Sequence, residues 1–192
     1  MALGYGLSAL GTESPAPGAK SQMHPHDERP YSFCPLCGAD LELRSIKPSE
    51  PDRLVCVQCG FIFYQDPKVA VATIILDGND QIVLVRRAIQ PGYGKWVCPG
   101  GFVDRGEEVV AAAIREAREE AGIDIRIDRL LNVYSYPGVA PVIIVYVATM
   151  TGGTLACDDE CLEVRLFAPE DIPWDELAFS STKEALTEFL QK

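Results

Sequence analysis

Long hydrophobic runs and an excess of basic residues are both missing from this 192-residue sequence. The longest strongly apolar run, residues 142–148, is far shorter than the roughly 20 residues that a membrane-spanning helix needs. Asp and Glu outnumber Lys and Arg by 28 to 17, so the formal net charge is −11. Nucleic-acid binding depends mainly on Lys and Arg that neutralise phosphates. We therefore expect neither a membrane span nor a nucleic-acid partner. An acidic protein that acts on a phosphate needs a divalent cation between the two.

Histidine is also scarce, since His24 and His26 are the only two. Both lie in a segment, residues 1–29, that is rich in Gly, Pro, Ser and Ala and has no sustained periodicity, which predicts a flexible tail. No positively charged stretch precedes an apolar core there, so we expect no secretory signal and a cytoplasmic protein. Because no histidine follows residue 26, a cysteine nucleophile would lack its usual base.

Four of the seven cysteines have the spacing of a zinc site. Two Cys-x-x-Cys pairs are separated by eighteen residues, and their members are Cys34, Cys37, Cys56 and Cys59. Four thiolates complete a closed tetrahedron, so this zinc would be structural. Two redox dithiols or two disulfides are the alternatives, but a reducing compartment favours metal. We expect a small β-type zinc ribbon over residues 30–66, with a role in folding, dimerisation or covering a site.

The other three cysteines, Cys98, Cys157 and Cys161, show no such partner pattern. Cys98 follows Trp-Val and is expected to be a small buried hydrophobic residue. None of the three is expected to be catalytic.

Residues 67–192 carry alternating strand and helix signals that predict one mixed sheet flanked by helices, a fold of the α+β class. The expected strands are residues 68–76, 81–87, 123–136, 141–150 and 162–167, and the first two form a hairpin around a turn at residues 77–80. The last helix is expected to begin near Ser181, where Ser-Thr-Lys-Glu has the form of a capping box. Its buried residues are predicted to be Ala185, Leu186, Phe189 and Leu190.

Between these strands, residues 99–123 read PGGFVDRGEEVVAAAIREAREEAGI. A loop at residues 99–101 precedes an expected helix over about residues 107–121. The stripe expected to face the core contains Val110, Ala113, Ile114, Ala117 and Ala121. Glu116, Glu119 and Glu120 stand at positions i, i+3 and i+4, so their carboxylates are predicted to converge on another flank.

Two explanations fit such a cluster of carboxylates. One is a solvated helix face on which Arg115 and Arg118 offset the negative charge. The other is a site for hard divalent cations, which prefer oxygen ligands. The full spacing, from Gly101 through Glu107 and the Arg-Glu and Glu-Glu pairs to Gly122, would match by chance about once in 10⁸ windows. This spacing favours the metal site.

The pattern resembles the signature of the Nudix hydrolases, with Ala117 in the first aliphatic position. A four-cysteine ribbon before such a domain is similar to the NADH pyrophosphatase type. The stretches RRAIQPGYGKWVCPGGFVDRGE and EVRLFAPEDIPWDELAFSS are similar to plant plastid Nudix proteins that hydrolyse FAD and ADP-ribose. The resemblance covers roughly residues 31–190. It implies a Nudix α/β/α sandwich and a homodimer.

The resemblance also implies roles for the residues of the helix. Glu116, Glu119 and Glu120 would hold Mg²⁺ or Mn²⁺, with the Gly100 carbonyl as a further ligand. Glu107 would assist through a metal-bound water, and Arg115 would orient the neighbouring carboxylates. Metal ions neutralise a pyrophosphate and acidify the attacking water. The base that accepts its proton lies either on the helix or on a loop between the last strands. That loop offers Asp158, Asp159, Glu160 and Glu163, of which we favour Glu160, with Glu120 next.

The substrate is expected to be a small nucleotide whose base stacks on an aromatic ring. Candidate rings are Tyr134, Tyr136, Trp96 and Phe179, and core packing explains each of them equally well. The NADH pyrophosphatase type carries a Ser-Gln-Pro-Trp-Pro-Phe-Pro motif, whereas residues 135–141 keep only the Ser and two prolines. We therefore expect FAD or ADP-ribose first, NADH second and nucleotide-pool housecleaning third. A sensor that binds an ADP-containing metabolite without cleaving it is the non-enzymatic alternative.

Overall fold

The computed structural model describes residues 31–191, and the tail expected over residues 1–29 lies outside them. The chain divides between Gln65 and Asp66 into two compact units, each of which has its own sheet. Among the described residues, no helix is long and apolar enough to cross a membrane.

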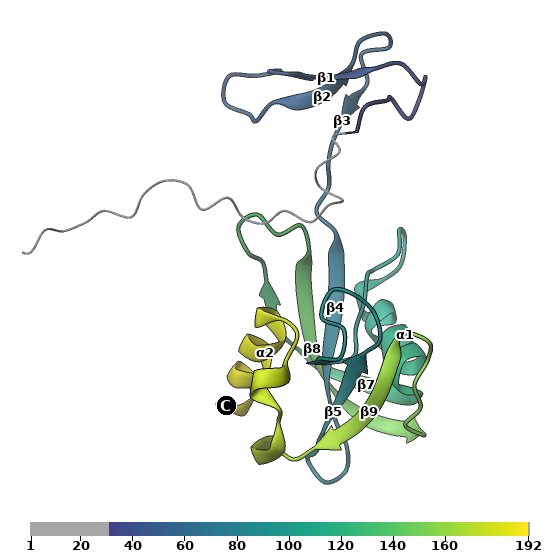
Figure 1. Ribbon diagram of the computed structural model, residues 1–192, viewed down its shortest axis with the longest axis vertical. Helices are drawn as coiled ribbons and strands as arrows, with labels where there is room; N and C mark the ends of the chain where they lie inside the picture. The colour runs from purple at the N-terminus through teal and green to yellow at the C-terminus, as the bar shows by residue number, and fades with distance from the viewer. Residues whose placement is uncertain (1–30, 192) are drawn as a thin grey trace, which may run out of the picture. The chain divides into compact units, whose positions relative to one another are not determined.

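The larger unit is built on a six-stranded mixed sheet (Figure 1). Its strands are β4 (Val69–Leu76), β5 (Ile82–Arg87), β6 (Trp96–Val97), β7 (Ile123–Tyr134), β8 (Val142–Gly153) and β9 (Cys161–Phe167). The order is β6-β5-β4-β8-β7, with β9 on β5. The β4–β8 pair is parallel, and the other pairs are antiparallel. The helices are α1 (Val109–Ala121) and α2 (Ser180–Leu190), and two short 3₁₀ helices, η1 (Pro169–Asp171) and η2 (Trp174–Glu176), precede α2.

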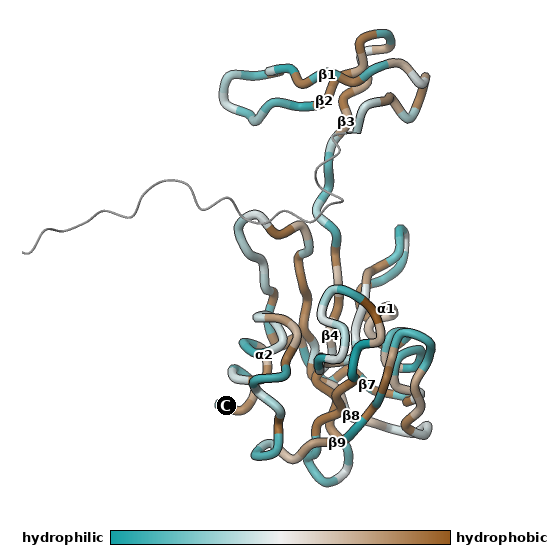
Figure 2. Tube along the Cα trace, viewed as in Figure 1, coloured by the Kyte–Doolittle hydropathy of each residue, from teal (hydrophilic) through white to brown (hydrophobic). Residues whose placement is uncertain are grey.

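Successive side chains of the central strands point to opposite faces of the sheet and build two cores. On one face Ile74 and Leu84 pack in the cluster that contains Leu186 of α2. On the other face Ile75 and Val83 pack in the cluster that contains Ala117 of α1. The hydrophobic segments of this unit are concentrated in the sheet (Figure 2). The prediction of a mixed sheet between helices is confirmed.

The buried face of α1 differs from the predicted stripe. Val110 and Ile114 are 41% and 39% exposed, so their assignment to the core was wrong. The residues that are buried are Ala112, Ala113, Glu116, Ala117, Glu120 and Ala121. The alanines are short enough to let the helix approach the sheet closely, which brings Glu116 and Glu120 inside with them. A hydrophobicity pattern places a Glu on the solvent side of a helix, so it does not predict that α1 turns Glu116 and Glu120 towards the sheet.

Two expectations near the C-terminus are also corrected. Helix α2 begins at Ser180, and its N-cap, Phe179, makes no side-chain capping bond, so the capping box at Ser181 was wrong. Ala185 and Leu186 are buried as predicted, but Leu190 in the last turn is 37% exposed.

The cysteines of this unit behave in two ways. Cys98 is buried and free, which confirms its prediction as a small core residue. Cys157 and Cys161, for which no partner was expected, form a disulfide with each other across the loop before β9. Their spacing of four residues carried no sequence signal, because only the turn of that loop brings the two Cα atoms to 5.2 Å.

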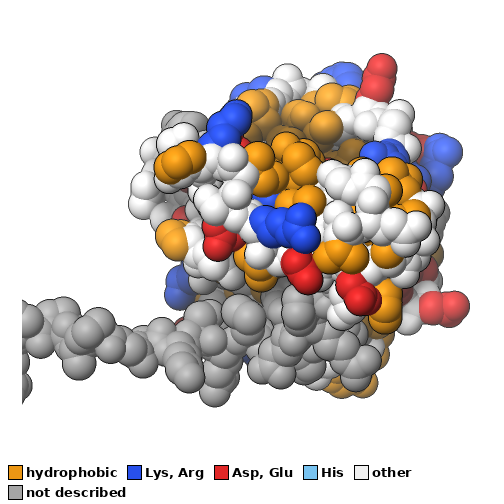
Figure 3. Space-filling view, turned by 90° about the horizontal axis from the view of Figure 1, so that it is seen from above, with side chains coloured by type: hydrophobic (Ala, Val, Ile, Leu, Met, Phe, Trp, Pro, Cys, Tyr) orange, Lys and Arg blue, Asp and Glu red, His pale blue; other side chains and the backbone are white. Residues whose placement is uncertain are grey.

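The smaller unit is a three-stranded antiparallel sheet of β1 (Leu41–Arg44), β2 (Arg53–Cys56) and β3 (Ile62–Phe63). Its core contains four buried residues, Cys34, Leu41, Leu54 and Cys56. Large hydrophobic side chains such as Phe33 and Leu36 are exposed on its surface, and the space-filling view shows hydrophobic side chains among charged ones (Figure 3). A core this small needs a disulfide or a metal to be stable.

The two Cys-x-x-Cys turns of this unit, residues 34–38 and 56–60, are called knuckles here, and they bring all four thiols together. Gly38 and Gly60 adopt positive φ angles of 75° and 72°, and each donates its N–H to the carbonyl of the first cysteine of its pair. The four sulfur atoms lie within 4.8 Å of one another. The close pairs run between the knuckles, 3.7 Å for Cys34–Cys59 and 3.4 Å for Cys37–Cys56. A zinc tetrahedron with Zn–S bonds of about 2.3 Å has sulfurs about 3.8 Å apart.

The pKa values of the thiols are shifted in different directions. That of Cys37 is raised to about 12, since hydrogen bonds to neighbouring thiols and burial outweigh the backbone N–H of Ala39, and that of Cys59 is also raised. The backbone N–H of Cys59 lowers the pKa of the Cys56 thiol to about 6, which favours the thiolate that binds zinc. Two separate dithiols would pair sulfurs within each knuckle, whereas one metal ion requires the observed approach between the two knuckles.

The cationic side chains of Arg44 and Lys47 pair with Glu42 and Glu50, so they are partly neutralised within the unit.

We predict that Cys59→Ser lowers the zinc content from about one ion per chain to well below that, because three thiolates leave the tetrahedron open. Elemental analysis of the purified protein measures this content. Cys98→Ala is the matched control, since it also removes one cysteine, and it should leave the zinc content unchanged. Equal zinc in all three proteins would contradict the assignment.

Candidate active site

A short extended segment, residues 99–101, lies against β4. The N–H of Thr73 donates to the carbonyl of Pro99 at 2.9 Å, and the N–H of Val71 donates to the carbonyl of Gly101 at 2.8 Å. In an extended chain, successive residues direct their N–H and C=O groups to opposite sides. Gly100 therefore directs its groups away from β4, and its N–H donates to Oε2 of Glu120 at 2.8 Å. Its carbonyl lies on the same side of the segment as that N–H.

Both glycines of this segment are required by close approach. A Cβ on Gly100 would lie 2.7 Å from the Cα of Ala72 in β4. A Cβ on Gly101 would lie 2.6 Å from Cδ and 2.7 Å from Oε2 of Glu116. Neither glycine has a positive φ angle, so the constraint is steric. The Gly-Gly pair lets the backbone fit between the sheet on one side and the carboxylates of α1 on the other.

Arg115 is the centre of the charged network on α1. Its Nε and Nη2 donate to the two carboxylate oxygens of Glu107 at 2.8 and 2.9 Å, the bidentate geometry of a strong ion pair. Its Nη1 donates to Glu116 at 2.8 Å and to Glu119 at 2.9 Å. Nη2 also reaches the carbonyl of Phe102 at 3.1 Å. One guanidinium thus fixes three carboxylates and the turn that precedes the helix.

The pKa values of the carboxylates are shifted in opposite directions, by burial for Glu116 and Glu120 and by Arg115 for Glu107. Burial raises the pKa of Glu120 to about 7, and the charges of Glu116 and Asp158 act in the same direction. Burial also raises the pKa of Glu116. The hydrogen bonds from Arg115 lower the pKa of Glu107 to about 2. Two buried carboxylates side by side are costly unless a cation neutralises them, and oxygen donors of this kind suit a hard divalent ion.

The predicted ligands share one flank of α1 without converging on one point. Among the described residues, the four ribbon cysteines are the only group of three or more His, Cys, Asp or Glu side chains that lie close enough together to hold a metal ion. Arg115 draws Glu119 and Glu116 towards itself, while Glu120 turns towards Gly100. Binding one metal ion through all three therefore requires rotations of their side chains.

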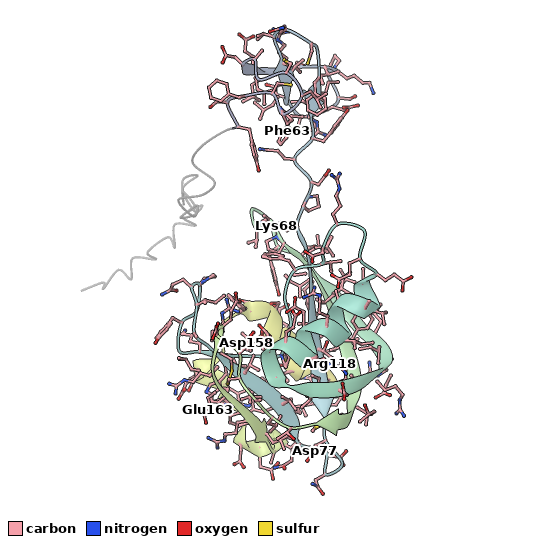
Figure 4. The ribbon with its side chains drawn as sticks, turned by 90° about the vertical axis from the view of Figure 1, so that its right-hand side faces the viewer. Phe63, Lys68, Asp77, Arg118, Asp158 and Glu163 are labelled. Atoms are coloured by element: carbon pink, nitrogen blue, oxygen red, sulfur yellow. A yellow bond between two sulfur atoms is a disulfide. The ribbon has the colours of Figure 1, made fainter. Side chains whose placement is uncertain are left out.

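The loop between β8 and β9 brings a further acid to this flank. Asp158 lies on this loop (Figure 4). Its charge raises the pKa of Glu120, and its Oδ1 accepts the N–H of Glu160 at 2.9 Å. The loop is tied to the end of β5, because the N–H of Ala88 donates to the carbonyl of Glu160 at 2.7 Å. Glu160 is exposed, and Glu163 lies 3.8 Å from Arg86 in an ion pair. Sequence reasoning ranked Glu160 first among these acids, but Asp158 is the one whose charge acts on Glu120.

The four candidate rings divide between the core and the surface. Trp96 is 4% exposed and packs edge-on against Phe167, with ring centroids 4.9 Å apart. Tyr134 is 8% exposed and donates its hydroxyl to Glu188 at 2.9 Å. Both rings pack in the core, which is the alternative that the sequence left open for them. Tyr136 is partly buried against the same core, and Phe179 is 36% exposed.

A Gly-Gly segment packed against a carboxylate-bearing helix, on a mixed sheet between two helices, forms a candidate site for a divalent cation. A family model described as the NUDIX domain matches residues 66–189, and a second one, described as Nudix N-terminal, matches residues 32–65. The chain belongs to the Nudix hydrolase family, and it carries the zinc-ribbon module of that family before its catalytic domain.

Known relatives agree with this assignment. An ADP-ribose pyrophosphatase of Methanocaldococcus jannaschii is 37% identical over 124 residues, which are 62% of this chain and 72% of the relative. The NAD-capped RNA hydrolase NudC of Deinococcus radiodurans is 28% identical over 85% of this chain, which spans only 58% of that relative. The crystal structure of a NUDIX hydrolase from Nitrosomonas europaea superposes with a TM-score of 0.79 at 36% identity, covering 83% of this chain and 90% of that one.

We predict that Gly101→Ala weakens Mn²⁺ binding roughly 10- to 100-fold, the range typical of changes next to metal ligands. The added methyl would displace the Glu116 carboxylate, which lies against this Cα. Calorimetric titration with Mn²⁺ measures the affinity. Gly78→Ala is the control, since a Cβ there meets nothing within 4 Å and should not change the affinity. Unchanged Mn²⁺ binding by Gly101→Ala would contradict the role given to Glu116.

Proposed function

We propose that this protein is a Mg²⁺- or Mn²⁺-dependent pyrophosphatase that cleaves a nucleoside diphosphate linked to a second group. ADP-ribose or FAD ranks first as substrate, NADH second. The observation that carries the proposal is the pair of buried carboxylates, Glu116 and Glu120, beside the backbone of Gly100. The likeness to an enzyme named as an ADP-ribose pyrophosphatase supports the ranking.

In this proposal Glu116, Glu119, Glu120 and the Gly100 carbonyl hold the metal. When bound, the metal neutralises the pyrophosphate and acidifies the attacking water. Arg115 holds Glu116, Glu119 and Glu107 in place through its hydrogen bonds. Water attacks one phosphorus atom, the bond to the bridging oxygen breaks, and a carboxylate accepts the proton of the water.

The base is proposed to be Glu120 or an acid of the loop before β9. Burial raises the pKa of Glu120 to about 7, close to the value at which a carboxylate accepts a proton most effectively. Glu160 was the loop acid favoured from the sequence. Asp158 is the other loop candidate, because it lies close enough to Glu120 for its charge to raise the pKa of that acid.

Two other functions remain open to test. A sensor would bind an ADP-containing metabolite without cleaving it, and a housecleaning enzyme would prefer a damaged nucleotide such as 8-oxo-dGTP. A homodimer belongs to the proposal, and light scattering measures the mass in solution.

We predict that the protein with Mg²⁺ cleaves ADP-ribose or FAD faster than NADH or 8-oxo-dGTP, with the products separated by chromatography. Glu120→Gln should lower kcat at least about 100-fold, because it removes a carboxylate that binds metal or accepts the proton.

Glu108→Gln is the matched control for this substitution. Glu108 is exposed and makes no capping bond at the start of α1, so its variant should keep full activity. If none of the four compounds is cut, or if Glu120→Gln cuts them as fast as the wild type, the proposed function is wrong.

The loop acids can be separated in the same assay. We predict that Asp158→Asn lowers kcat by about tenfold or more, while Glu160→Gln changes it less, because the Asp158 charge acts on Glu120. Steady-state kinetics of both variants measure this difference. The reverse order would restore Glu160 as the preferred loop acid.

A further inference from the structure

Arg87 ends β5, and its side chain lies against the residue that precedes α2. Its Nε donates to the carbonyl of Pro91 at 2.8 Å, which fixes the direction of the guanidinium. The guanidinium carbon lies 5.3 Å from the ring centroid of Phe179, the residue that precedes α2. Cation–π contacts form within about 6 Å, so the two side chains touch as a pair.

Arg87 also lies beside the loop before β9. It pairs with Cys161 of β9, and the N–H of the next residue, Ala88, donates to the carbonyl of Glu160 at 2.7 Å. A cation therefore lies beside the loop that carries the candidate acids, and its guanidinium is stacked on an aromatic ring.

The pair borders an open hollow at the start of α2. The hollow is lined by Trp174, Asp175, Leu177, Ala178, Phe179, Ser180 and Lys183. The loop that carries Pro91 packs tightly on its wall, since a Cβ on Gly92 would lie 2.9 Å from Cβ of Ala178 and 3.6 Å from Cδ of Arg87. Phe179 is 36% exposed, so part of its ring remains available to a ligand.

We infer that Arg87 and Phe179 form the subsite for the nucleotide half of the substrate, in which Arg87 binds a phosphate oxygen and Phe179 stacks on the base. The inference rests on the proposed function and adds the residues that select a nucleotide. Within residues 31–191 the Nε–Pro91 bond is the only hydrogen bond of the Arg87 side chain, so its two terminal nitrogens remain for a phosphate. Aromatic stacking accepts any base, which suits a substrate such as ADP-ribose or FAD.

The competing explanation is that the pair only fastens the loop of residues 88–95 to α2. If the pair is purely structural, its substitution lowers the stability and weakens the binding of all ligands alike. If the pair is a subsite, loss of Arg87 weakens only ligands with a phosphate, and loss of Phe179 weakens only ligands with a base. Three small probes separate these parts: AMP has a base and a phosphate, ribose 5-phosphate has only the phosphate, and adenosine has only the base.

Calorimetric titration of the full chain with each probe in the presence of Mg²⁺ tests the division. Arg87→Met keeps the length of the side chain and removes its charge, and it should weaken AMP and ribose 5-phosphate about tenfold or more without affecting adenosine. Phe179→Leu keeps apolar bulk and removes the ring, and it should weaken AMP and adenosine about tenfold without affecting ribose 5-phosphate.

Arg165→Met is the matched control, because Arg165 lies 4.6 Å above Phe167 in the same kind of contact but pairs with Leu84 in the middle of β5. It should leave all three affinities unchanged. Thermal melting of each variant checks that it is folded. Arg87→Lys keeps the positive charge, so it should bind ribose 5-phosphate more tightly than Arg87→Met does. Equal losses for all three probes, or no loss for any of them, would overturn the inference.

Turnover by the wild-type protein separates this inference from the proposed function. If ADP-ribose and FAD are cleaved but the variants do not lose affinity for the probes in the expected pattern, the subsite is wrong and the function stands. If no pyrophosphate bond is cleaved but the variants lose affinity for the probes in the expected pattern, the function fails and the nucleotide subsite stands.

Discussion

The close approach of the Gly100–Gly101 backbone to α1 is the constraint on which the candidate active site depends. One side of this segment is bonded to β4, so its position is set by the central sheet. Its other side is in contact with the carboxylates of Glu116 and Glu120, where a Cβ would not fit. The helix can come this close because the residues beside these acids are alanines. Sheet, turn and helix therefore hold the backbone of these acids beside the Gly-Gly segment, while their side chains remain free to rotate towards a metal ion.

Electrostatics explains why this arrangement needs a partner of positive charge. Burial raises the pKa values of both Glu116 and Glu120, so each is poorly solvated as an anion. Arg115 compensates on one side, and a divalent cation supplies compensation on the other in the proposed function. The same reasoning accounts for an acidic chain acting on an acidic substrate. In the inferred subsite, Arg87 adds a local positive charge without altering the acidic character of the protein as a whole.

Much of the fold could be predicted because its signals are local. The apolar run at residues 68–76, the turn after it and the helix before Gly122 all depend on neighbours in the sequence, and their bounds lie close to those observed. The failures have physical causes that involve distant residues. Val110 and Ile114 were expected in the core, but the contact with β4 rotates α1 towards its acids. The Ser181 capping signal was local, but Ser181 itself is buried within the first turn of α2.

The sequence by itself determined the chemistry that is available: two cysteine knuckles, a Gly-Gly turn and carboxylates at helical spacing, because the spacing of these residues encodes local geometry. Only the tertiary structure decided which of them meet. It buried Trp96 and Tyr134, left Phe179 partly exposed beside Arg87, and placed Asp158 where its charge acts on Glu120. These relations join residues on separate strands, loops and helices, and the packing of the sheet between its two helices fixes them.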